Sequence, residues 1–197
     1  SHGMILEVLR KVNIPVHVLI RPRSGDFTYS EDEIKIMKRD ITFCKEAGCD
    51  GIVSGVLHDD FTLNTEDTDV LFKAAEGMHL TFHRAFDWVK NPIQTLEQLI
   101  ALNCNTILTS GQSKSAIEGI DLLVKLKEAA KGRCVIMPGG GINEDNVLSF
   151  KENGFEAIHF SATRSKQKMS TSPPISMNSK KFLDETILAI SDKEIIR

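Results

Sequence analysis

Short apolar runs alternate with longer amphipathic segments along most of this 197-residue chain. The runs are apolar at consecutive positions and rich in β-branched residues, which is typical of strands buried on both faces of a parallel sheet. They cover residues 16–20, 51–55, 80–83, 106–109, 134–137 and 157–160. The segments between them repeat apolar residues at helical spacing, over residues 30–47, 67–75, 92–102, 115–130 and 144–151. The pattern therefore predicts successive parallel βα units.

Local start and stop signals support several of these helices. Ser30 and Glu33 form a capping box, Gly48 is a helix stop, and Pro92 suits a first helical turn. A further helix is expected over residues 5–12, ahead of the first strand, and a terminal helix around residues 181–190. The segment 161–179, rich in Ser, Thr, Lys and Pro, is expected to be a flexible loop.

The spacing of the strands defines the fold class. Strands that recur at roughly 25–35 residues indicate an α/β fold, either a (β/α) barrel or a doubly wound sheet. About six units is two fewer than a complete barrel contains. Nothing divides the chain, so residues 5–197 are expected to form a single barrel-like domain. Residues 1–4 are interpreted as a tag remnant followed by a start methionine.

Composition and charge narrow the function classes. The net charge is −3 with acidic and basic residues interleaved, so nucleic acid and membrane surfaces are not expected partners. The four cysteines occur without a secretory signal, which favours a reduced, intracellular protein without disulfides. Their spacing matches no zinc motif, so they are interpreted as buried hydrophobes or surface thiols, and the spacing predicts no metal ligands.

The candidate chemistry lies where the strands end, because ligands of parallel α/β folds bind at the carboxyl ends of the strands. The residues at these ends are rich in arginine, histidine, hydroxyl groups and glycine: Arg21, Arg23, His83, Arg84, Asp87, Ser110, Gly111, His159 and Ser161. Guanidinium groups and backbone amides suit an oxyanion. The pattern therefore predicts a site for a small anion, most naturally a phosphate.

The glycine triplet Gly139, Gly140 and Gly141 adds to this prediction. It follows the run 134–137 and precedes a predicted helix, so its backbone N–H groups and the helix N-terminus would face a ligand. Glycines after a strand also form plain tight turns, and that interpretation stays open.

Each side chain has a structural alternative. Arg21 and Arg23 could pair with carboxylates such as Asp26, and His83 could be a core histidine bonded to backbone. Asp87 is equally suited to cap the following turn, to hold Arg84 or to act as a base. For His159, a ligand contact and a structural role are equally compatible with its place in an apolar strand end.

Several segments together resemble the CutC family of copper homeostasis proteins. They are Ile-Arg-Pro-Arg-Ser-Gly-Asp-Phe at 20–27, Thr-Phe-His-Arg-Ala-Phe-Asp at 81–87, Leu-Thr-Ser-Gly at 108–111, Met-Pro-Gly-Gly-Gly-Ile at 137–142 and Glu-Ala-Ile-His-Phe-Ser-Ala at 156–162. The resemblance runs from about residue 14 to residue 164 and keeps the order of the motifs.

The resemblance implies a TIM-type (β/α) barrel, here apparently lacking the first one to two βα units. It also implies a cytoplasmic homodimer or larger homo-oligomer with a role in copper handling through Cu(I) binding. The cysteines implicated in family copper binding belong to the units that this chain lacks, and none of Cys44, Cys49, Cys104 and Cys134 matches them.

Two functions therefore compete. In the first, the chain is a CutC-like protein that binds or traffics Cu(I). In the second, it is an enzyme or binder for a small phosphorylated or carboxylated metabolite: Arg21, Arg23 and Arg84 bind the anion, and His83 acts as general acid/base oriented by Asp87. No organic cofactor is expected in either case. A third alternative is an idle barrel fragment that serves only as an assembly partner.

Overall fold

The computed structural model describes residues 1–171, 173–175 and 187–191, and they form two compact units, Ser1–His159 and Phe160–Arg197. The first unit contains strands β1 (His17–Leu19), β2 (Gly51–Ser54), β3 (His79–Phe82), β4 (Thr106–Thr109) and β5 (Val135–Pro138). Its helices are α1 (His2–Lys11), α2 (Glu31–Ala47), α3 (Thr65–Ala74), α4 (Pro92–Ala101), α5 (Ile120–Ala130), α6 (Val147–Glu152) and the 3₁₀ helix η1 (Arg84–Trp88).

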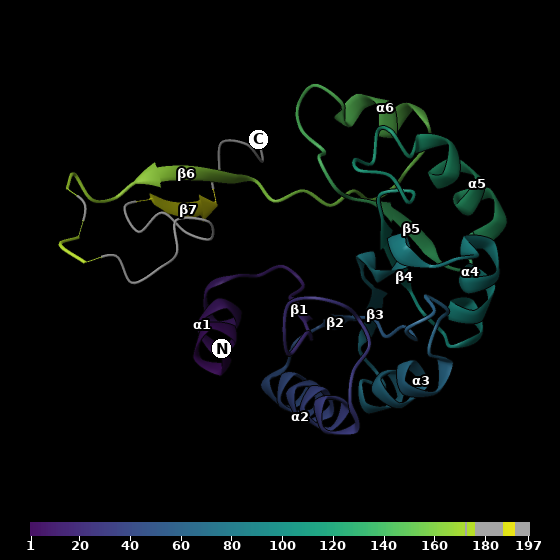
Figure 1. The fold of residues 1–197 in the computed structure, drawn as a ribbon, viewed down its shortest axis with the longest axis horizontal. Coiled ribbons are helices and arrows are strands. Elements are labelled where there is room, and N and C mark those ends of the chain that lie inside the picture. Colours follow the sequence, from purple (N-terminus) through teal and green to yellow (C-terminus); the bar gives the residue numbers. More distant parts are fainter. Residues whose placement is uncertain (172, 176–186, 192–197) are drawn as a thin grey trace. The chain divides into compact units, whose positions relative to one another are not determined.

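The five strands form one parallel sheet in the order β1-β2-β3-β4-β5. Each strand thus pairs with the next one along the chain, which is the topology of a (β/α) barrel. Figure 1 shows helices α2 to α5 on the outer side of the strand arc. The predicted α/β class and parallel βα units are confirmed. The sixth predicted run, 157–160, contributes only an isolated parallel bridge between Gly139 and His159.

A continuous apolar core fills the space between the strands and the outer helices. Fully buried side chains come from the strands and from the facing sides of the helices: Ile52, Phe82, Ile107, Met37, Ile41, Leu71, Leu96, Leu99, Leu123 and Leu126. Burying side chains of this size contributes about 1.5–3 kcal/mol each. This core holds the strand ends, and hence the site, in place.

The local signals place most helix ends correctly. Ser30 and Glu33 make the predicted capping box at the start of α2, and Gly48 ends that helix at φ +85°. Pro92 occupies the first turn of α4. The helix expected over 5–12 is α1, which begins earlier, at His2.

Two helices begin later than predicted, and this changes the interpretation of the glycine triplet. Helix α5 starts at Ile120 rather than near residue 115, and α6 starts at Val147 and has 6 residues. Two asparagines organise the turn between the glycine triplet and α6. The Asn143 side chain accepts from the Asp145 backbone N–H, and the Asn146 side chain accepts from the Asn143 backbone N–H. The helix N-terminus expected directly after the glycines is therefore absent there.

The second unit contains an antiparallel pair, β6 (Thr163–Gln167) and β7 (Ile187–Ser191). Strand β6 lies inside the segment 161–179 that was expected to be a flexible loop, and β7 replaces the end of the expected terminal helix 181–190. Both predictions are wrong at these residues. The remainder of the predicted helix, residues 181–186, lies outside the described residues. The pattern predicts one domain over residues 5–197, whereas the structure separates the residues after His159.

None of the helices in the described part of the chain is both long enough and apolar enough to cross a membrane.

Candidate functional site

A pocket of about 450 Å³ lies along the inner face of the strand arc, on the side of the sheet opposite the core. It takes side chains from all five strands and from the loops that follow them: His17, Leu19, Arg21, Phe27, Val53, Thr81, His83, Arg84, Leu108, Met137 and His159. Four residues of the predicted anion site, Arg21, His83, Arg84 and His159, thus line one cavity. Their convergence follows from the parallel strand order.

His83, at the end of β3, is a buried titratable group of the pocket, with only 5% of its surface exposed. The Ala85 backbone N–H donates to its Nδ1 at 3.2 Å, so Nδ1 is an acceptor and the ring proton lies on Nε2. Nε2 itself has no hydrogen-bond partner in residues 1–171, 173–175 and 187–191. Burial lowers the pKa of His83 from 6.5 to about 4, and the nearby Arg21 guanidinium acts in the same direction. At neutral pH the ring is therefore a neutral N–H donor.

Arg21 follows β1 and brings positive charge to the same cavity. Its Nη2 donates to the Gly25 carbonyl oxygen at 2.6 Å, and its guanidinium carbon lies 4.6 Å from the centre of the Phe27 ring. These contacts fix the side chain, while its Nε is buried without a hydrogen-bond partner among the described residues; the unpartnered Tyr29 hydroxyl lies near the same guanidinium. Two buried donors, one on Arg21 and one on His83, thus belong to residues that line one pocket.

Asp87 organises the loops around Arg84. Its carboxylate is 8% exposed and accepts from Arg84 Nε at 2.7 Å. It also accepts from the hydroxyl of Thr109 and from the backbone N–H groups of Ser110 and Gln112. Arg84 Nη2 in turn donates to Ser110 Oγ at 2.9 Å. Asp87 therefore orients Arg84, and no hydrogen bond links it to His83, so the structure does not support its predicted role as orienter of that histidine.

The glycines after β5 allow close approach to these groups. A Cβ atom on Gly140 would lie 3.1 Å from Arg84 Nη1, and one on Gly139 would lie 2.5 Å from Leu108 Cδ1 and 3.2 Å from His159 Cβ. Gly140 and Gly141 also have positive φ angles, +113° and +72°, which side chains rarely adopt. Glycine is required here by packing and backbone geometry.

Three predicted site residues lie elsewhere. Arg23 is held by Glu33, Asp26 and the Thr28 carbonyl oxygen, and it does not line the pocket. Gly111 packs against the backbone of Gly119, where a Cβ would lie 2.3 Å from the carbonyl oxygen. Ser161 belongs to the second unit. Ser110 touches the site only through Arg84.

The structure also brings together groups that sequence analysis did not connect. Cys104 and Cys134 are both buried, and their thiols lie close enough for each to shift the pKa of the other. The Cys104 Sγ also lies 3.2 Å from the Thr106 carbonyl oxygen. The two residues precede β4 and β5, which pair directly, so only the strand register could have revealed this contact.

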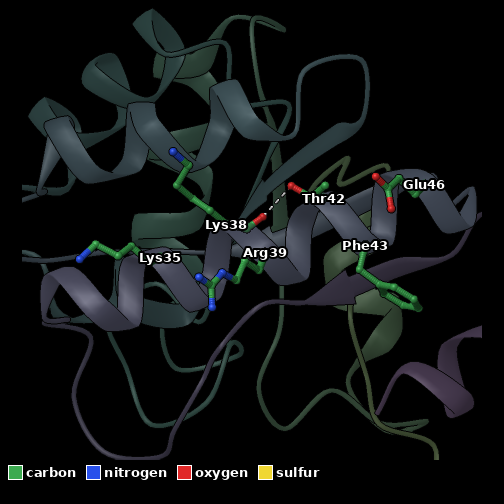
Figure 2. A pocket seen from close by; sticks show the side chains of 6 residues that line it. All are labelled: Lys35, Lys38, Arg39, Thr42, Phe43 and Glu46. Atoms are coloured by element: carbon green, nitrogen blue, oxygen red, sulfur yellow. Dashed lines mark hydrogen bonds between the residues drawn. The ribbon is translucent and has the colours of Figure 1, made fainter.

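A second hollow, of about 440 Å³, lies on the outer face of α2 (Figure 2). Its lining is largely cationic and comes from one helix: Lys35, Lys38, Arg39, Thr42, Phe43 and Glu46. In Figure 2 the side chains of Lys38 and Arg39 point to different sides of the helix. They do not converge on a common ligand, so the inner pocket is the better candidate.

Comparison with known proteins identifies relatives over most of the chain. The model of the CutC family matches residues 1–164. A CutC family protein from Glaesserella parasuis serovar 5 is 44% identical over 171 residues, which are 86% of this chain and 70% of that protein. A human protein named copper homeostasis protein cutC homolog is 40% identical over 200 residues, covering 100% of this chain and 73% of the relative.

Solved structures agree with the fold. The crystal structure of a CutC protein from Streptococcus agalactiae superposes with a TM-score of 0.77 at 36% identity, covering 81% of this chain and 80% of the other. The aldolase QR15 superposes with a TM-score of 0.63 at 13% identity, over 80% of this chain and 73% of its own, which shows a shared fold alone. Homo-oligomer assembly and a cytoplasmic location stay predictions from the family resemblance.

Proposed function

The chain belongs to the CutC family, and we propose that it shares the copper-homeostasis role named for its human relative while its inner pocket binds a small anion. The pocket proposal rests on one observation. Within the part of the chain that the structure describes, His83 Nε2–H and Arg21 Nε–H are buried donors without acceptors, and both residues line the same cavity. A buried donor left unsatisfied costs about 1–3 kcal/mol, so an acceptor ligand at this position is strongly favoured.

The chemistry of the donors defines the ligand class. A neutral imidazole N–H next to guanidinium groups stabilises negative charge on oxygen, as in sites that polarise a carbonyl or hold a phosphate. The rest of the wall is largely apolar, including Leu19, Val53 and Leu108. The best fit is a phosphate or carboxylate carried on a short apolar body. In any reaction His83 would act as an electrophilic N–H donor, because its low pKa keeps the ring neutral, with one proton on Nε2, at neutral pH.

Isothermal titration with inorganic phosphate, at constant ionic strength, tests this proposal. We expect saturable binding to the full chain, weakened at least roughly tenfold by His83→Phe or by Arg21→Met, since each removes a charge-assisted or buried hydrogen bond. Arg133→Met is the matched control, because Arg133 pairs with Glu97 outside the pocket. Binding that is absent, or that all three substitutions weaken equally, would contradict the proposal.

A second function, Cu(I) binding, is supported by the thiol pair of Cys104 and Cys134. Thiolates are the ligands that Cu(I) prefers. No group of three or more His, Cys, Asp or Glu side chains suited to a metal occurs among the described residues. A site with two sulfur ligands fits Cu(I) better than Zn²⁺, which almost always takes four ligands. The interaction with the Cys104 thiol lowers the pKa of Cys134, which favours a thiolate at this pair.

Anaerobic titration of the reduced chain with Cu(I) against a competing chelator tests this second function. We expect one tightly bound Cu(I) that is lost in Cys104→Ser and Cys134→Ser. The pair Cys44→Ser and Cys49→Ser is the comparison, because these two buried thiols also lie close together but at the end of α2. Loss of binding only in the comparison pair would move the site there, and no binding in the parent chain would remove the copper proposal without affecting the anion pocket.

A further inference from the structure

Three aromatic rings meet in a hollow of about 230 Å³ beside the mouth of the pocket. Phe27 and Trp88 approach edge to face with ring centres 4.8 Å apart, and Phe61 and Trp88 are nearly perpendicular at 6.1 Å. Trp88 and Phe61 are 47% and 46% exposed. Large aromatic side chains usually bury most of their surface, so this exposed arrangement indicates a contact surface.

The hollow is preformed by two loops that hold each other. Leu57 and Leu63 form an antiparallel bridge that closes the loop carrying Phe61. The Lys90 backbone N–H, just after η1, donates to the Phe61 carbonyl oxygen at 3.3 Å, and Lys90 Nζ pairs with Asp60. Phe61 has a φ angle of +65°, a conformation that is unusual for a bulky residue and recurs at ligand contacts. The ring is therefore held outward by its backbone.

The charged residues that line the hollow are acidic. Asp26 and Asp59 line it together with the rings. Hydrogen bonds from Thr28 and Arg23 lower the pKa of Asp26 to about 2, so it is ionised at neutral pH. Arg23 balances that charge, while Asp59 makes no ion pair with any residue that the structure describes. The hollow therefore combines aromatic side chains with one carboxylate that has no ion-pair partner among the described residues.

We propose that this hollow binds an organic ammonium group. Aromatic faces attract cations through their quadrupole, and several rings around one position recognise methylated ammonium groups in particular. The carboxylate of Asp59 adds attraction for a cation and opposes an anion. Phe27 lines both this hollow and the inner pocket, and the Arg21 guanidinium lies over its ring, so Phe61 and Trp88 are the rings available to a cation. The inference does not depend on the proposed anion site.

Trp88 reports on this site directly, because it is the one tryptophan of the chain. Titration of the full chain with tetramethylammonium chloride, against sodium chloride at equal ionic strength, should give a saturable change in tryptophan fluorescence. Tert-butanol, which is similar in shape but neutral, should give none. The expected effect of Phe61→Leu is an increase of the dissociation constant by roughly three- to thirtyfold, the range of one cation–π contact.

Further variants separate a binding role from a structural one. Phe61→Tyr retains the aromatic face and should retain binding, and Asp59→Asn should weaken it in a salt-dependent way. Phe43→Leu, on α2, is the control and should change nothing. An equal response to tert-butanol, no response to tetramethylammonium, or unchanged affinity in a folded Phe61→Leu variant would overturn the proposal.

Discussion

Replacing Asp87 with asparagine removes the charge that connects the loops after β3 and β4. The carboxylate is 8% exposed and receives donors from Arg84, Thr109, Ser110 and Gln112. Asparagine has nearly the same size, but it loses the charge and turns an N–H₂ group toward at least one of these donors. The substitution therefore probes electrostatics with little change in packing.

The expected cost follows from these contacts. Hydrogen bonds to a charged group contribute about 1.5–3 kcal/mol each, but Arg84 is 44% exposed and water partly replaces its lost partner. We therefore expect Asp87→Asn to lower the free energy of unfolding by about 2–4 kcal/mol, out of a total of about 5–15 kcal/mol for a domain. With a urea dependence of about 2 kcal/mol/M, the unfolding midpoint should fall by about 1–2 M.

Urea unfolding followed by circular dichroism measures this shift. The matched control is Asp69→Asn, because Asp69 pairs with Lys73 on the surface of α3, where the lysine side chain is 76% exposed. Such exposed pairs contribute at most about 0.5 kcal/mol. A midpoint for Asp87→Asn no lower than that for Asp69→Asn would refute the assignment of Asp87 as the organiser of these loops.

Three further predictions follow from named residues. In the folded state His83 stays neutral down to its pKa of about 4, whereas in the unfolded chain it binds a proton below about pH 6.5. The free energy of unfolding should therefore fall by roughly 3 kcal/mol as the pH drops from 6.5 to 4. Urea titrations at several pH values should show this loss in the parent chain and not in His83→Phe. Gly55→Ala places a Cβ 2.8 Å from the His83 ring, which should lower the free energy of unfolding by about 1–3 kcal/mol and weaken phosphate binding. Gly3→Ala is the control: its Cβ meets no atom within 4 Å, so it should leave the free energy of unfolding unchanged. Asp26, whose pKa is lowered to about 2, contributes stability that is present above pH 4 and is lost as the pH falls toward 2. In Asp26→Asn the free energy of unfolding should therefore depend less on pH between 4 and 2. An unchanged pH dependence would count against this contribution.

The fold was largely predictable from sequence because its signals are local. Buried parallel strands are apolar at consecutive positions, and the ends of α2 and α4 carry side chains that cap them. The errors occur where tertiary contacts decide. Residues 187–190 combine helix-compatible spacing with β-branched residues, and pairing with β6 makes them a strand. The late start of α6 reflects asparagine side chains that satisfy the preceding turn instead.

The site was predictable only in part. Parallel topology predicts that strand ends converge, and this placed Arg21, His83, Arg84 and His159 correctly in one cavity. The sequence does not show which arginine forms an ion pair with a carboxylate. Arg23 does so with Glu33, ten residues further along the chain. It also does not show strand register, so the contact between Cys104 and Cys134 was missed.

The central claim is that His83 presents a neutral Nε2–H to an anionic ligand in the inner pocket. Nuclear magnetic resonance of ¹⁵N-labelled histidine observes this ring directly. We predict the Nε2–H tautomer for His83 at pH 7 and a saturable shift of its Nε2 resonance when inorganic phosphate is added, with no such shift in Arg21→Met. A protonated ring, the Nδ1–H tautomer, or a resonance that phosphate leaves unchanged would contradict the account.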